Sequence, residues 1–232
     1  MTIVKFFIVL FFLVYACKLD VKSRTVPNRV WKYMLIFSLP ITFFELLLFY
    51  PSYFLATSVL HMAITISLAY LFYVIGAYGG ADAKAIICLA VIFPFYPDPI
   101  FPLQKGINVG FSSLANSVIL VPALTFAMFF KNLRKDPRGF FSSPLYYFIG
   151  YRAKIEKIPK FHNLLEIVEN GKLKKLKKGV EVSDENLKKL KEIGVKEVWI
   201  TPALPFIVFI TFGYISTFLF GDFLFFLINF LK

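Results

Sequence analysis

A chain of 232 residues in which 58% are hydrophobic, 19% aromatic and only 17% charged is too apolar to hide its hydrophobic side chains in a soluble core. Of its 26 basic and 14 acidic residues, 17 and 9 fall between positions 131 and 200, so the chain is an apolar body with one polar insert. This excludes a disordered protein, a disulfide-stapled secreted domain and a soluble nucleic-acid-binding protein, although the net charge is +12.

Six apolar stretches approach the length of about 20 residues that a membrane-spanning helix needs. They lie at roughly 2–18, 30–50, 54–76, 83–97, 107–130 and 203–230. The fourth stretch is short and is interrupted by Pro94, Pro97 and Pro99, so we expect it to be kinked or to enter the bilayer less deeply than the others.

The first stretch also has the length of a signal peptide, and Val14–Cys17 loosely resembles a lipoprotein cleavage box. A signal peptide carries its positive charge before the apolar region, whereas here Lys5 alone precedes it. Five cations follow it instead: Lys18, Lys22, Arg24, Arg29 and Lys32. We therefore expect the first stretch to be retained as a membrane span.

Cys17 and Cys88 stand singly in apolar surroundings, which predicts buried packing residues and no metal site or disulfide.

Basic residues collect in the cytoplasmic loops of membrane proteins. With six crossings, the five cations of loop 18–32, Lys84 and the 17 basic residues of the insert all lie on one side, which accounts for 23 of 26. Lys5, Lys105 and Lys232 lie on the other side. Hydropathy and charge therefore predict the same topology, in which both termini are outside and the insert is cytoplasmic. The basic excess is explained without nucleic acid.

The insert reads as a small α+β module. Two strands, Leu164–Glu169 and Lys172–Leu176, flank Asn170-Gly171, the preferred dipeptide of a type I′ hairpin turn. A helix follows, capped by Ser183, with Leu187 and Leu190 on one face and Gly194 at its end, and Val195–Thr201 is expected to return as a strand. The lysine-rich run Lys172–Lys178 is read as a solvated face that could also contact anionic membrane lipid.

Five acidic residues lie outside the insert, and ionisable groups in or beside spans are functional candidates. Asp20 follows the first span and Asp82 opens the fourth. Because two spans separate them, both carboxyls are expected at the cytoplasmic edge. Their flanks read Asp20-Val21-Lys22-Ser23-Arg24-Thr25-Val26-Pro27-Asn28 and Gly79-Gly80-Ala81-Asp82-Ala83-Lys84, and the small residues before Asp82 permit close approach of backbone or substrate. Structural readings remain open: Asp20 could pair with Lys18 or Arg24, and Asp82 could cap a helix.

Two carboxyls a few ångströms apart cannot both ionise cheaply, so such a pair shares one proton. The charged member can deprotonate water while the neutral member protonates a peptide carbonyl. This arrangement suits aspartyl peptide hydrolysis, which requires no metal or cofactor. Because the pair titrates as a unit, neither aspartate is singled out as the acid.

The two motifs together resemble those of the type IV prepilin peptidase group, in particular the archaeal preflagellin peptidases, and the resemblance covers essentially the whole chain. The family pattern is Gly-x-Gly-Asp (GxGD), and Ala81 stands here at the second glycine. The cysteine-containing loop of many bacterial members and a recognisable N-methyltransferase domain are absent from the sequence, so we expect no methylation of the product.

The resemblance implies an all-α polytopic membrane protein, a six-helix transmembrane bundle with a small α+β cytoplasmic domain inserted between helices five and six. Its parts would be helices one to five at 1–130, the soluble domain at 131–201 and helix six at 202–232. The implied function is an aspartic endopeptidase of the plasma membrane that removes a short basic leader from preflagellin or pilin-like precursors on the cytoplasmic side.

Carried over by position, the resemblance makes Asp20 and Asp82 the catalytic pair. The supporting motif residues are Gly79, Gly80, Ala81, Lys84, Lys22, Pro27 and Asn28. Of these, Gly79 and Ala81 would shape the approach to Asp82, while Pro27 would fix the turn into the second span and Asn28 would cap it.

The remaining acids have simpler readings. Glu45 and His61 are expected to hydrogen-bond each other near the outer leaflet, Asp98 to be solvated in an outer loop, and Asp222 to lie near the outer boundary, away from the pair.

Two alternatives to a protease remain. One is a proton- or ion-coupled transporter, which is disfavoured by the lack of matching halves and of midplane carboxylate pairs, and the other is a noncatalytic subunit of a secretion or pilus machine.

Overall fold

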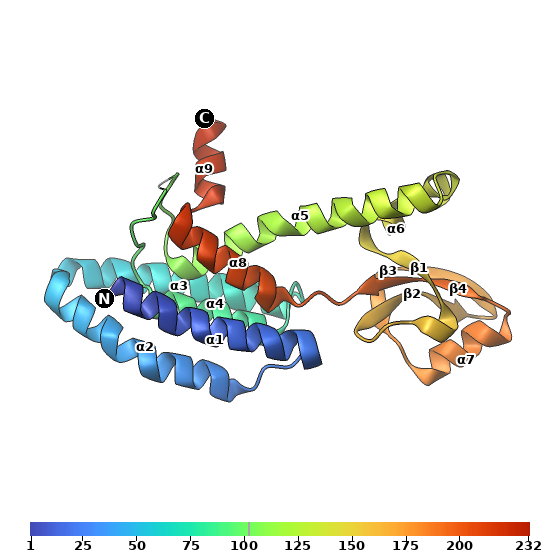
Figure 1. Cartoon of the computed structure of the whole chain (residues 1–232), viewed down its shortest axis with the longest axis horizontal. Coiled ribbons are helices and arrows are strands. Elements are labelled where there is room, and N and C mark those ends of the chain that lie inside the picture. Colours follow the sequence, from blue (N-terminus) through green and yellow to red (C-terminus); the bar gives the residue numbers. More distant parts are fainter. Residues whose placement is uncertain (102) are drawn as a thin grey trace. The chain divides into compact units, whose positions relative to one another are not determined.

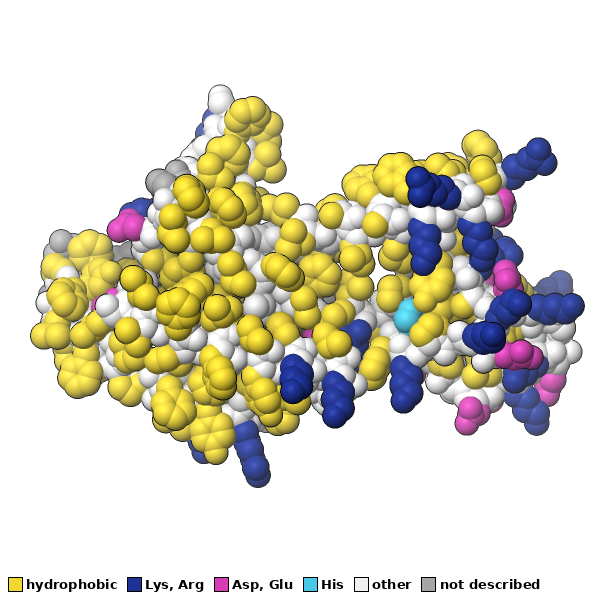
Figure 2. All heavy atoms as spheres, in the orientation of Figure 1, with side chains coloured by type: hydrophobic (Ala, Val, Ile, Leu, Met, Phe, Trp, Pro, Cys, Tyr) yellow, Lys and Arg dark blue, Asp and Glu magenta, His cyan; other side chains and the backbone are white. Residues whose placement is uncertain are grey.

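The computed structural model describes residues 1–101 and 103–232, with the backbone alone at 52 and 53, and its contacts divide the chain into two compact units (Figure 1). The first unit comprises Met1–Leu120 and Pro205–Lys232, and the second Val121–Leu204. On the face shown in Figure 2, hydrophobic side chains cover the first unit, whereas Lys and Arg side chains gather on the second.

The first unit is helical and holds the candidate membrane spans. Its helices are α1 (Thr2–Ser23), α2 (Asn28–Phe49), α3 (Ser52–Val74), α4 (Gly80–Ile92), the first part of α5 (Val109–Lys135), α8 (Phe206–Leu219) and α9 (Phe223–Phe230). Among the described residues, four helices are long and apolar enough to cross a membrane, namely α1, α2, α3 and α5. Helices α4 and α8 have only 13 and 14 residues, about 20 Å each at 1.5 Å per residue.

Helices α2 and α8 each pack against both α1 and α4, and this contact builds the buried core. Leu13 of α1, Met34 of α2, Leu89 of α4 and Ile210 of α8 belong to it and have no exposed surface. The ends of α1 and α4 are therefore fixed by shared neighbours. This matters because the two candidate aspartates lie at those ends.

The structure modifies the expected fourth and sixth spans. Helix α4 ends at Ile92, since Pro94 disfavours helical backbone at Phe93, whose φ and ψ are −123° and 72°. The continuous sixth helix expected at 203–230 is wrong, because the chain breaks between α8 and α9. Gly221 has φ +100°, the Asp222 N–H donates to the Gln104 carbonyl at 2.8 Å, and the Asp222 carboxyl caps α9.

The second unit contains an antiparallel four-stranded sheet in the order β1-β4-β2-β3. Its elements after α5 are the short 3₁₀ helix η1 (Arg138–Ser142), α6 (Pro144–Ile149), β1 (Tyr151–Lys154), η2 (Ile155–Lys157), β2 (His162–Glu169), β3 (Lys172–Glu181), α7 (Asp184–Glu192) and β4 (Glu197–Pro202). The hairpin prediction is confirmed, with φ +51° at Asn170 and +72° at Gly171. So is the Ser183 cap, whose Oγ accepts the Asn186 N–H at 3.2 Å.

The two faces of this sheet are covered by different elements. Leu164 and Val198 face α7, where Leu190 completes one buried cluster. Their chain neighbours Leu165 and Trp199 face the other way, because successive strand residues alternate sides, and pack with Tyr146 and Tyr147 of α6. The last turns of α5 belong to this second face, so a membrane-length helix contributes to the core of the polar unit.

Candidate active site

Asp20 lies in the last turn of α1 and is 8% exposed. Its carboxyl is close to the guanidinium of Arg24 and to the backbone N–H of Ile207 in the first turn of α8. Oδ2 is buried and has no hydrogen-bond partner within the described residues. The α1 helix ends three residues after Asp20, at Ser23, and its C-cap residue Arg24 adopts the left-handed conformation with φ +56°. Asp20 is therefore a buried carboxyl at a helix end, and solvation does not explain its position.

Asp82 lies in the first turn of α4, at the third helical position, and is also 8% exposed. Its Oδ2 accepts the Gly79 N–H at 2.9 Å, which satisfies one of the free donors at the helix start. The expected helix-capping role is thus present, although Gly79 and not Asp82 is the N-cap residue. A Cβ at position 79 would lie 3.3 Å from Asp82 Oδ2, so the absence of a side chain there fits the position of this carboxyl.

The two carboxyls belong to the same unit, and their charges are close enough to interact. Tyr78, in the loop before α4, is a further neighbour: burial, and secondarily the negative charge of Asp82, raise its pKa to about 12. The Tyr78 ring stacks on Phe206 at 5.7 Å, and its hydroxyl donates to the Ala69 carbonyl at 3.0 Å. Tyr78 is therefore an uncharged side chain beside Asp82. The sequence reading missed it because one tyrosine among 12 carries no motif.

The supporting motif residues are only partly arranged as expected. Pro27 is the N-cap of α2, so the expectation that Asn28 caps this helix is wrong. The amide oxygen of Asn28 instead accepts a hydrogen bond from Lys84 Nζ at 2.7 Å, which joins the two motifs across α2 and α4. Ala81 packs against the buried core, while the side chain of Lys22 is exposed.

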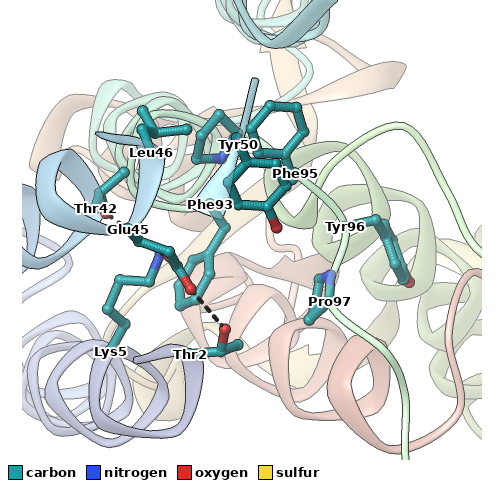
Figure 3. Close-up of a pocket in the computed structure, with 11 residues that line it drawn as sticks. Thr2, Lys5, Thr42, Glu45, Leu46, Tyr50, Phe93, Phe95, Tyr96 and Pro97 are labelled. Atoms are coloured by element: carbon teal, nitrogen blue, oxygen red, sulfur yellow. Dashed lines mark hydrogen bonds and ion pairs between the residues drawn. The ribbon is translucent and has the colours of Figure 1, made fainter. Parts of the chain in front are cut away.

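A second polar site lies at the opposite ends of these helices. Lys5 is 2% exposed and donates to the Glu45 carboxylate, to Thr42 Oγ1 at 3.4 Å and to the Ile92 carbonyl at 3.1 Å. Figure 3 shows this group around a cavity of about 30 Å³, with Thr2 Oγ1 donating to Glu45 at 3.0 Å. Every charge there has a partner, and the cavity is little larger than a water molecule, so the arrangement is structural.

This ion pair corrects the expected Glu45–His61 hydrogen bond, which is wrong. The partly buried carboxylate of Glu45 gains more from the ammonium of Lys5 than from a neutral imidazole, because only the ammonium offsets its charge. The main-chain carbonyl of His61 accepts from Asn108 Nδ2 at 3.0 Å.

The last two acids lie away from the candidate pair. Asp98 is solvated as expected and pairs with Lys105 at 2.5 Å on the surface. Asp222 has no exposed surface: it receives hydrogen bonds from Ser112 Oγ and from the Phe225 N–H at 3.0 Å. Asp222 follows the C-terminal end of α8, about 20 Å along the helix axis from Ile207 in its first turn. Its hydrogen bonds stabilise the break between α8 and α9. Within residues 1–101 and 103–232, no three His, Cys, Asp or Glu side chains are grouped as a metal site requires.

Comparison with known proteins covers both units. Residues 7–129 match the type IV leader peptidase family, and residues 142–223 match the archaeal peptidase A24 C-terminus, type II. A preflagellin peptidase of Methanocaldococcus jannaschii is 27% identical over 223 residues, covering 88% of each chain. A preflagellin peptidase of Methanococcus voltae is 29% identical over 214 residues, covering 88% of this chain and 89% of its own.

Proposed function

Because this chain belongs to the type IV leader peptidase family, we propose that it cuts leader peptides with Asp20 and Asp82 as a proton-sharing catalytic pair. The family and the preflagellin peptidase relatives establish a leader-removing membrane protease. The observation that supports the aspartyl assignment is the burial of two carboxyls with interacting charges, one at the end of α1 and one at the start of α4.

The chemistry follows from the shared proton. The ionised carboxylate takes a proton from water, the water oxygen attacks the scissile carbonyl carbon, and the protonated carboxyl gives its proton to the carbonyl oxygen. When the tetrahedral diol collapses, the C–N bond breaks, the leaving nitrogen takes up one proton, and the pair again holds the other. Each turnover consumes one water, and the two residues exchange acid and base roles.

The substrate would be a preflagellin or pilin-like precursor with a basic leader and an apolar helix just after the cut. That helix can lie in the bilayer beside α1 to α4, whose outward side chains, such as Phe7, Phe11 and Phe37, are exposed and apolar. The scissile bond would then lie at the membrane edge, where water is available.

The proposal includes the topology that places both aspartates in reach of the cytoplasm. Of the membrane-length helices, α2 and α3 lie between Asp20 and Asp82, so if both cross, the two residues would return to the same side. A six-span bundle additionally requires the short helices α4 and α8 to cross with the help of flanking residues. In that topology both termini are outside the plasma membrane and 131–201 is a cytoplasmic domain between spans five and six.

The test is cleavage of a synthetic precursor by detergent-solubilised protein. We expect Asp20→Asn and Asp82→Asn each to lower cleavage by at least about 10⁴-fold, since neither amide can accept or donate the shared proton. Asp98→Asn is the matched control, because it makes the same chemical change at a solvated surface position and should retain full activity. Cleavage retained by either pair variant, in protein that still accumulates in membranes, would exclude the pair.

A further inference from the structure

The segment that follows α5 in the second unit exposes large apolar side chains. Phe141 of η1 is 87% exposed, and Leu145 of α6 is also exposed. Both lie within ten residues of the end of a helix that is long and apolar enough to cross a membrane. A phenylalanine held in water so close to a membrane span needs an apolar partner.

This segment folds back along α5. Phe148 stacks on Phe129 of α5 with ring centroids 4.6 Å apart, and it also contacts Phe126 at 6.5 Å. Phe140, the neighbour of Phe141, contacts the same Phe129 at 5.7 Å. Phe140 and Phe148 therefore bring two points of this segment back to the level of Phe129, although the segment itself begins at the end of α5, where the Gly139 N–H donates to Asp136 Oδ1 at 2.9 Å.

The position of Phe129 along α5 indicates the depth of these ring contacts in a bilayer. The apolar stretch 109–130 is about 33 Å long, close to the hydrocarbon thickness of about 30 Å. Phe129 lies at the end of that stretch, where a spanning helix passes from acyl chains to headgroups. Phe141 and Leu145 belong to the segment that Phe140 and Phe148 hold against Phe129, near the depth at which aromatic and aliphatic side chains anchor membrane proteins.

Cations surround the same level. Lys131, Arg134 and Lys135 occupy the next turn of α5, Arg138 opens η1, and all four side chains are exposed. Lys175 of β3 joins them, since its Nζ donates to Ser143 Oγ and lies 5.7 Å from the centre of the Tyr146 ring. An apolar insertion flanked by clustered cations is complementary to the surface of a bilayer that contains anionic lipid.

We propose that residues 138–149 are a lipid anchor of the second unit, in which Phe141 and Leu145 enter the bilayer interface and the surrounding cations bind anionic headgroups. The lysine run of β3 suggested lipid contact from the sequence; the structure assigns this role mainly to the segment between α5 and β1, with Lys175 beside it. The anchor is independent of the catalytic chemistry, since Asp20 and Asp82 belong to the other unit.

Spin labels measure this depth in the full chain. With Cys17 and Cys88 replaced by serine and alanine, a nitroxide is attached to Phe141→Cys in nanodiscs that contain phosphatidylglycerol. The matched control is Ile193→Cys, a 39% exposed position at the end of α7 on the opposite face of the sheet. We expect oxygen to relax the label at 141 several-fold more effectively than a water-soluble nickel chelate, and the reverse order at 193.

Other outcomes overturn the proposal. A label at 141 that is as accessible to the nickel chelate as the label at 193 would show that the segment lies in water. A label shielded from both relaxants would show that protein covers it. The headgroup contact has its own test: Arg134→Gln with Arg138→Gln should shift the label at 141 toward water in phosphatidylglycerol nanodiscs and leave it unchanged in pure phosphatidylcholine. An equal response in both lipids would exclude anionic recognition.

Discussion

At the scale of single residues, the position of the Asp82 carboxyl depends on the missing side chain of Gly79. In Gly79→Ala the new methyl group would lie 3.3 Å from Oδ2, so the carboxyl would move by a few tenths of an ångström. We expect cleavage efficiency to fall by about five- to tenfold, because catalytic groups tolerate little displacement. Steady-state cleavage of a synthetic precursor measures this effect.

Gly80→Ala is the control for that variant, since a Cβ at position 80 makes only an ordinary 3.4 Å contact with the Tyr73 ring. Equal losses in the two alanine variants would mean that helix-start propensity, and not carboxyl placement, sets the effect.

Tyr78 predicts a specific dependence of stability on alkaline pH. Burial and the charge of Asp82 raise its pKa from 10 to about 12, so the folded protein keeps this proton where the unfolded chain loses it. The stabilisation is complete below pH 10 and is lost as the pH rises toward 12. Thermal unfolding in detergent between pH 9 and 12 should show a steeper decline for wild type than for Tyr78→Phe. Parallel curves would contradict the role of this hydroxyl.

Single residues differ in how far the sequence predicts their contacts. The sequence singles out Asp20 and Asp82 as candidates because acids at span edges are rare and because the number of expected crossings between them is even, and the structure buries both carboxyls. The hydrogen bond between Lys84 and Asn28 and the ion pair between Lys5 and Glu45 were missed. Such pairing depends on the rotation of each helix about its axis, and nearly uniform hydrophobicity around these helices leaves that rotation undetermined.

At the scale of elements, the break between α8 and α9 depends on Gly221. Its φ of +100° is open only to glycine, and a Cβ there would lie 2.2 Å from the Gln104 carbonyl oxygen. We expect Gly221→Ala to destabilise the protein by about 3 kcal/mol or more, through backbone strain together with a clash against backbone. The midpoint of thermal unfolding in detergent measures the loss.

Gly171→Ala separates the two causes. This glycine also has a positive φ, +72°, but a Cβ there meets nothing within 4 Å, so only strain of about 1 to 2 kcal/mol is expected. If Gly221→Ala costs no more than Gly171→Ala, the contact with Gln104 does not hold the break.

Elements with strong local signals were predictable, and the others were not. Asn170-Gly171 and the Ser183 cap fix the hairpin and α7 through short-range chemistry. By contrast, the stretch 203–230 is apolar apart from a few positions such as Asp222, and the contacts that stabilise its break come from Ser112 and Gln104, more than 100 residues away in the chain. The four-residue strand β1 was also missed, because its register comes entirely from pairing with β4.

At the scale of the whole molecule, the proposed topology predicts which loops a thiol reagent reaches from outside. In a background without Cys17 and Cys88, cysteines are placed at Thr25, Ala77 and Asp98, which are exposed positions after α1, α3 and α4. An impermeant maleimide should label Asp98→Cys in intact cells, whereas Thr25→Cys and Ala77→Cys should react only after permeabilisation. Labelling of the cysteines at positions 25 and 77 from opposite sides of the membrane would exclude an active site that contains both Asp20 and Asp82.

The sharing of α5 between the two units has a practical consequence for dissecting the protein. Sequence polarity suggests a cut at Lys131, yet a fragment beginning there would lose Phe129 and leave the rings of Phe140 and Phe148 bare in water. A fragment beginning at Val121 would keep that cover and carry half of an apolar helix with it. Truncation alone therefore does not yield a soluble fragment suitable for crystallisation. A soluble fragment would need polar residues in place of Phe140 and Phe148.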